Sequence, residues 1–145
     1  MKKVFIKVVL SLFIIFLFGL SCYADDVKLQ NYKYSIDEEL SRCSSANFMT
    51  VGMNLCIQKG IDSWNKEIDR YLLKIKSKLS TQDIENLEKS QQAWLTYYKK
   101  EEMFINGAIG IKSGDIHTTI ALDEFYELTK QRALKLRGYY IELSE

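Results

Sequence analysis

Three cysteines have the most distinctive chemistry in this chain. Cys22 lies near the N-terminus, and Cys43 and Cys56 lie close together further along. If the N-terminal segment is removed on export, an even pair remains, which in an exported protein indicates a disulfide. A bridge closing a loop of about 15 residues adds about 3 kcal/mol in the chain-entropy model. The alternative is that both cysteines are reduced, buried thiols.

Catalytic and metal-binding groups are sparse. His117 is the sole histidine, and a zinc site needs three or four His, Cys or carboxylate ligands, so we expect neither a metal nor a cofactor. No serine lies in a recognisable nucleophile turn. Adjacent acids such as Glu101 and Glu102 can serve glycosidase chemistry only across a sugar-binding cleft, and they are more typical of solvated helix faces. The sequence therefore favours a protein that is not an enzyme, with an unrecognised hydrolase as a minor alternative.

Two polar residues lie where apolar ones are expected. Gln91 falls between Leu87 and Trp94 on one helical stripe, and Arg132 lies on another. Burying either side chain is costly unless its hydrogen bonds are satisfied. The two can pair with each other or with Glu67 or Asp69. We interpret them as a structural network, with partner recognition as the alternative.

The N-terminus carries an export signal. Lys2, Lys3 and Lys7 precede the uncharged run 8–20, and small residues lead to a cleavage position between Ala24 and Asp25. This pattern predicts a signal peptide over residues 1–24, too short in its apolar run to span a membrane. Lipidation at Cys22 or an uncleaved anchor are the alternatives. We expect a periplasmic or secreted protein that meets the membrane only through this signal or, failing that, through a lipid on Cys22.

Cleavage changes the charge balance. The chain holds 20 Lys and Arg against 19 Asp and Glu, and losing three lysines leaves 20 − 3 = 17 basic residues and a net charge of −2. Because a chain with this net charge has no excess of basic residues to contact phosphates, nucleic-acid binding is disfavoured.

Helical periodicity dominates the rest of the chain. From residue 50 to Leu79 apolar residues recur every three or four positions, which predicts one long amphipathic helix. Its stripe is Ile57, Ile61, Trp64, Ile68, Tyr71, Leu72, Ile75 and Leu79. Gly60 interrupts it and is tolerable where a neighbour packs closely. We expect Trp64 and Trp94 to serve the core rather than a ligand.

Further helices are expected on both sides of this one. A short helix should run from Ile36 to about Arg42, capped by Ser35, after a flexible lead-in over residues 25–34. Ser80 should cap an antiparallel helix over about 81–105 with the stripe Ile84, Leu87, Gln91, Trp94, Tyr98 and Ile105. A glycine-rich loop over 106–115 should precede a last helix ending near Leu143. The inward residues of that helix should be Ile120, Ala121, Phe125, Leu128, Arg132, Leu136 and Tyr139. The predicted class is all-α: three long antiparallel helices, a short N-terminal helix and one disulfide.

The pattern from Cys43 to Leu136 resembles the lysozyme inhibitor LprI-like family of small exported bacterial proteins. The resemblance rests on the cysteine pair, on SQQAWL with Gln91 and Trp94, and on Thr129 with Arg132. A further segment holds Asn65, Asp69 and Leu72, where the family more often has Asp, Asn and Tyr. A second disulfide that many relatives carry is missing, since neither Glu102 nor Glu124 is a cysteine.

The resemblance implies a helical domain over residues 35–145 that binds a protein partner such as lysozyme and inhibits it or a related peptidoglycan hydrolase. Its motif residues, Asn65, Asp69, Gln91, Trp94, Thr129 and Arg132, would be structural. The candidate partner-binding residues are acidic: Asp115, Asp123, Glu124 and Glu127. The alternative is a periplasmic binding or interaction module for another envelope or host partner.

Overall fold

The computed structural model describes residues 34–110 and 115–145, and every regular element in them is helical. The elements are α2 (Ser35–Ala46), α3 (Thr50–Lys76), α4 (Thr81–Ile105), the short π-helix η1 (Asn106–Gly110) and α5 (Asp115–Glu142). The predicted class, with three long helices, a short one and one disulfide, is confirmed. The expected signal peptide and lead-in up to residue 33 lie outside the described residues.

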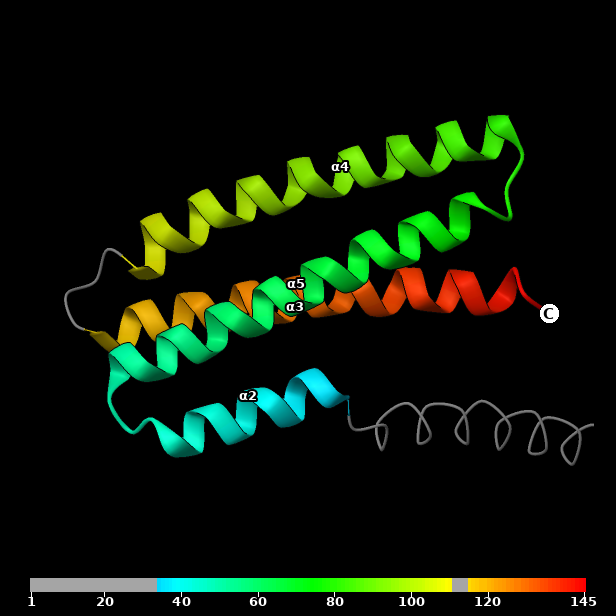
Figure 1. The fold of residues 1–145 in the computed structure, drawn as a ribbon. Coiled ribbons are helices and arrows are strands. Elements are labelled where there is room, and N and C mark those ends of the chain that lie inside the picture. Colours follow the sequence, from blue (N-terminus) through cyan, green and yellow to red (C-terminus); the bar gives the residue numbers. More distant parts are fainter. Residues whose placement is uncertain (1–33, 111–114) are drawn as a thin grey trace, which may run out of the picture. The chain divides into compact units, whose positions relative to one another are not determined.

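The core lies along the seam between α3 and α5, which run beside each other in Figure 1. α3 buries nearly its whole predicted stripe, with Leu72 half-covered. It ends at Lys76, before the predicted end at Leu79, which is half-covered in the turn that leads to α4. Ile75 from α3 and Leu136 and Thr129 from α5 are almost fully enclosed. Because each fully buried Leu or Ile contributes about 1.5–3 kcal/mol, this seam carries most of the hydrophobic stabilisation.

Gly60 permits the closest approach between these two helices. A Cβ built at this position would lie 2.6 Å from Cε2 of Tyr126, so the aromatic ring occupies the space that any side chain would need. The glycine that weakens α3 by its helix propensity thus allows Tyr126 to pack against the α3 backbone.

α2 is tied to α3 by the predicted disulfide. Cys43 and Cys56 are bridged with their Cα atoms 5.7 Å apart. α2 continues to Ala46, beyond the predicted end near Arg42, with Ser44 and Ser45 inside the helix. The Ser45 hydroxyl donates to the Ser41 carbonyl at 2.8 Å, which lets a residue that often ends helices remain inside one.

α4 is the least buried of the long helices. Ser80 caps it as predicted: its Oγ accepts from the Asp83 amide and donates to the Asp83 carboxylate at 2.6 Å. α4 runs antiparallel to α3 in Figure 1, but its backbone approaches α5 more closely than α3. Ile105 is its only buried residue, and the rest of the predicted inward stripe is half-exposed.

Two details of the last connection and helix differ from the sequence prediction. η1 occupies the first half of the predicted loop, so the chain leaves α4 through a wide helical turn. Ile120 and Tyr139, expected inside, are 39% and 41% exposed, whereas Tyr126, Thr129 and Ala133 are buried. The reason is that α5 faces α3 on one flank and α4 on the other, so its covered surface is wider than one stripe.

Candidate partner-binding site

Arg132 and Gln91 meet between α5 and α4. The Nε and Nη2 atoms of Arg132 donate to Oε1 of Gln91 at 2.9 and 2.8 Å. The same guanidinium lies 5.7 Å from the centre of the Trp94 ring, within cation–π range. Partial burial lowers the pKa of Arg132. The sequence left Gln91, Glu67 and Asp69 as possible partners of Arg132. In the structure Arg132 bonds to Gln91, and neither Glu67 nor Asp69 lies at this contact.

Thr129 extends this contact one turn along α5. It is fully buried, and its hydroxyl donates to the Phe125 carbonyl at 2.7 Å. The Tyr98 ring lies 5.3 Å from the Trp94 ring and 6.1 Å from the Phe125 ring, centre to centre. Burial raises the pKa of the Tyr98 phenol, and a hydrogen bond with Thr129 partly offsets the rise. Gln91, Trp94, Thr129 and Arg132 therefore hold α4 against α5.

Asn65 and Asp69 lie elsewhere. They are one turn apart on α3, and both are exposed to solvent. Their neighbour Glu67 forms an ion pair with Arg70, and this hydrogen bond raises the pKa of the guanidinium. The six motif residues thus separate into an interhelical cluster and an exposed pair.

The acidic candidates lie along the first half of α5. Asp115 is its first residue, and Asp123, Glu124 and Glu127 are exposed on the following turns. Partial burial and the neighbouring Glu124 carboxylate raise the pKa of Asp123. Glu101 and Glu102 near the end of α4 add to these acids, whereas Lys112 lies between α4 and α5 in the sequence. The first half of α5 is therefore rich in acidic residues.

A family model described as lysozyme inhibitor LprI matches residues 43–136. The chain belongs to this family. The matched segment begins at the first bridged cysteine and ends at Leu136, so it contains the disulfide, the α4–α5 cluster and the acidic half of α5.

The LprI fold of this chain is similar to a solved structure. The crystal structure of an uncharacterised protein from Burkholderia thailandensis superposes with a TM-score of 0.72 at 20% identity, over 79% of this chain. The match spans 57% of that protein, and at this identity the likeness shows the fold alone. No curated protein sequence matches the chain.

One set of contacts in this LprI chain carried little sequence signal. The Tyr126 hydroxyl donates to Asp37 Oδ1 at 2.5 Å, and Lys130 Nζ lies 2.9 Å from Asp37 Oδ2. These contacts join α2 to α5, which lie far apart in the sequence. The sequence feature that related to them was Gly60, because a glycine inside a helix indicates that a neighbouring element packs closely there. Burial, followed by the hydrogen bond to Asp37, raises the pKa of Tyr126.

A candidate site for a small molecule lies in the described part of the LprI domain. A hollow of about 290 Å³ lies between α2 and α3, beside the disulfide, and its polar lining includes Ser35, Glu39 and Lys59. Residues 34–110 and 115–145 contain no group of three potential metal ligands. None of the helices in these ranges has the length and hydropathy of a membrane span.

Proposed function

We propose that this protein is an exported, non-enzymatic inhibitor of lysozyme or of a related peptidoglycan hydrolase. The observation that carries the proposal is the LprI family match, which extends over residues 43–136 and over the helices that form the core. The Cys43–Cys56 bridge is consistent with an oxidising compartment outside the cytoplasm, as the expected signal peptide requires.

The physical basis is occlusion by a rigid helical module. The acidic end described above complements a basic enzyme, and this complementarity raises the association rate more than the final affinity. From 112 to 130 the four acids of α5 outnumber Lys112 and Lys130, and Lys130 is paired with Asp37. A basic enzyme would therefore be steered toward the first half of α5.

Cell-wall clearing tests this function. Exported protein, purified with its disulfide intact, is added at micromolar concentration to a panel of muramidases acting on cell walls. We expect slower clearing by at least one enzyme, with an effect that weakens as salt rises. Unchanged clearing across the panel would contradict the proposal.

The hollow beside the disulfide favours a second candidate, a binding module for another envelope or host partner or for a small ligand. A pull-down from envelope extracts separates the two functions. Recovery of a partner that is not a hydrolase, together with unchanged clearing, would support the second.

A further inference from the structure

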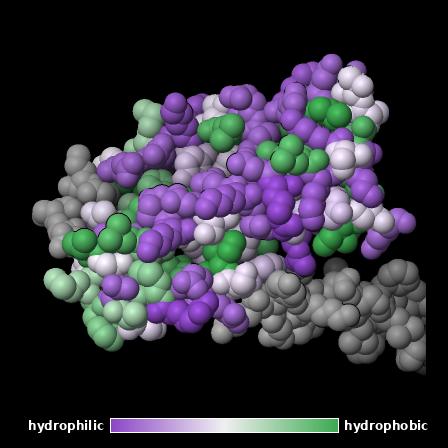
Figure 2. All heavy atoms as spheres, viewed as in Figure 1, coloured by the Kyte–Doolittle hydropathy of each residue, from purple (hydrophilic) through white to green (hydrophobic). Residues whose placement is uncertain are grey.

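The corner between α2 and α3 exposes an unusual amount of apolar surface. Phe48 is 89% exposed, Met49 78%, Val51 67% and Leu55 60%. Single exposed hydrophobic residues are ordinary, but a cluster within one short segment marks an interaction site. Figure 2 shows hydrophobic residues gathered at the end of the bundle where this corner lies.

The corner also lacks charge. Residues 43–58 contain no Asp, Glu, Lys or Arg, in a chain in which 27% of residues are charged. Charges on a solvent-exposed turn would keep it soluble and repel partners, so their absence here leaves the apolar side chains free to be covered.

Covalent and polar contacts fix the shape of this corner. The disulfide joins its two ends, and Asn47 donates from Nδ2 to the Cys43 carbonyl at 2.8 Å. A Cβ at Gly52 would lie 2.8 Å from Cβ of Asn47, so the turn closes tightly on itself. Thr119 donates to Asn54 at 2.7 Å and anchors the start of α3 on α5. A segment held in this way loses little conformational entropy on binding, which favours affinity.

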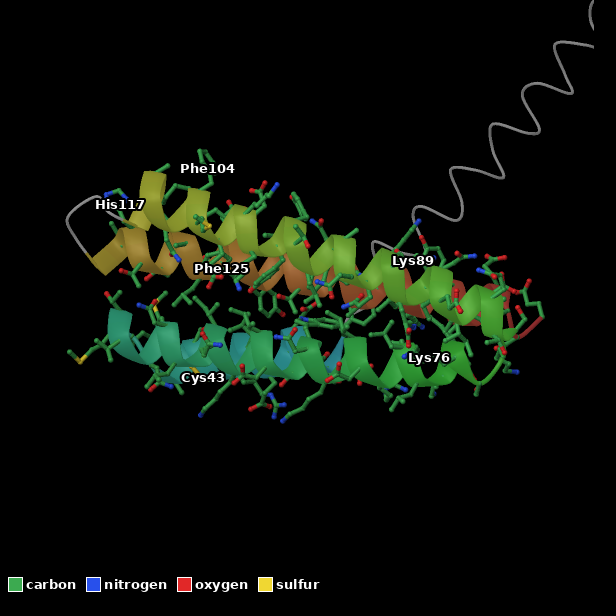
Figure 3. All side chains as sticks on the ribbon, turned by 90° about the horizontal axis from the view of Figure 1, so that it is seen from above. Cys43, Lys76, Lys89, Phe104, His117 and Phe125 are labelled. Atoms are coloured by element: carbon green, nitrogen blue, oxygen red, sulfur yellow. A yellow bond between two sulfur atoms is a disulfide. The ribbon has the colours of Figure 1, made fainter. Side chains whose placement is uncertain are left out.

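The surroundings of the corner are apolar and acidic. The Asn54–Thr119 bond places the start of α5 beside the corner, and α5 there carries exposed Ile116 and Ile120, followed by the acidic residues. Figure 3 shows Phe104 and His117 at this same end, with Phe104 projecting outward and Lys76 far from them. An uncharged apolar centre therefore has acids on its α5 side, whereas the charged residues that flank it along the chain are Arg42 and Lys59.

These features discriminate among occupants. An anionic bilayer attracts apolar segments flanked by Lys and Arg, but here Arg42 is paired with Glu39 and the acids of α5 would be repelled. A second copy related by a two-fold axis would bring the acidic borders together, and like charges across an interface are unfavourable. A basic protein with an apolar cleft matches both the centre and the border.

We infer that the disulfide-closed corner around Phe48 and Met49 is the anchor that enters the cleft of a basic partner enzyme, and that the acids of α5 pair with the rim of that cleft. This inference rests on the proposed inhibitor function and identifies the surface responsible for it. Interfaces concentrate their binding energy in a few central side chains, and Phe48 and Met49 occupy that place here.

The test uses two matched variants of the exported protein. Phe48→Ser with Met49→Ser removes the anchor, and Leu73→Ser removes a side chain that is 71% exposed at the other end of α3. Both leave the core untouched, which circular dichroism and thiol titration verify. We expect the corner variant to raise the inhibition constant at least tenfold and the Leu73 variant to change it less than twofold. Glu124→Gln with Glu127→Gln should mainly slow association at low salt.

The outcomes separate the inference from the function beneath it. If wild-type protein inhibits and the corner variant inhibits equally well, the corner is not the anchor and the inhibitor function stands. If wild-type protein inhibits no enzyme of the panel, both the inhibitor function and the inference about the corner are contradicted. Sedimentation with anionic vesicles, or a dimer that the corner variant abolishes, would overturn the choice of a basic enzyme as occupant.

Discussion

α3 and α4 are consecutive helices of similar length, 27 and 25 residues, yet α3 has eight buried residues and α4 has one. Both carry apolar residues at helical spacing. The difference is that the α3 stripe is apolar at every step, whereas the α4 stripe contains Gln91 and packs onto α5 partly through Arg132. A helix held by a polar contact gains less on packing, because the desolvation of that contact offsets much of the attraction.

The comparison shows that α2, α3 and α5 form a tightly packed unit and that α4 packs more loosely against it. α2, α3 and α5 are joined by the apolar seam, the disulfide and the Asp37–Tyr126–Lys130 contacts. α4 is joined by the Gln91–Arg132–Trp94 cluster, by Ile105 and by the Lys76–Glu88 ion pair near its start. We expect α4 to open before the rest.

The largest contrast is expected between two leucines. Leu136→Ala empties a site with 0% exposure and should cost about 3–4 kcal/mol of unfolding free energy. Leu87→Ala removes the same atoms from the half-exposed face of α4 and should cost about 1 kcal/mol. Urea unfolding of both variants measures the difference, and equal losses would mean that α4 is packed as tightly as the seam.

Removing the disulfide should weaken the tight unit almost as much. The double change Cys43→Ser and Cys56→Ser should cost about 3 kcal/mol, because the unfolded chain regains the entropy of an open loop. Thermal unfolding under matched buffer conditions measures it, with wild-type protein under reducing agent as the control. A loss below about 1 kcal/mol would show that the seam alone fixes α2.

The polar cluster should behave asymmetrically. Arg132→Ala leaves Gln91 partly covered without its donor and should cost about 1–3 kcal/mol, whereas Arg132→Met with Gln91→Met should cost less, because no polar group is then stranded. Amide exchange should show faster opening of α4 in the single variant. If the double methionine variant were less stable than Arg132→Ala, the Gln91–Arg132 contact would be a net source of stability. It would then do more than determine where α4 packs.

The smallest effect is expected from Tyr126→Phe, about 1 kcal/mol, since it removes the hydroxyl that donates to Asp37 and keeps the buried ring. The pH dependence is more informative. Because the folded pKa of Tyr126 lies above its ordinary value of 10.0, its stabilisation is complete below pH 10 and is lost as pH rises toward the folded value. Tyr126→Phe should flatten this alkaline loss, and Tyr97→Phe, at an exposed position, should leave the loss unchanged.

The sequence by itself determined the class of fold and most of its elements. Helical spacing located α3, Ser80 marked the start of α4, and the parity of the cysteines predicted the bridge that the structure contains. These features depend on neighbours a few positions apart, so local chemistry is enough to specify them. The LprI resemblance is confirmed by the family match.

The tertiary structure alone decided which faces meet. Ile120 and Tyr139 fit an inward stripe but are exposed, while Tyr126 and Thr129 are buried, because α5 packs against two helices at once. It also chose Gln91 as the partner of Arg132 and left Phe48 and Met49 exposed at a rigid corner. The physical reason is that spacing defines the stripes on each helix, whereas the approach and crossing of the helices determine which side chains are covered.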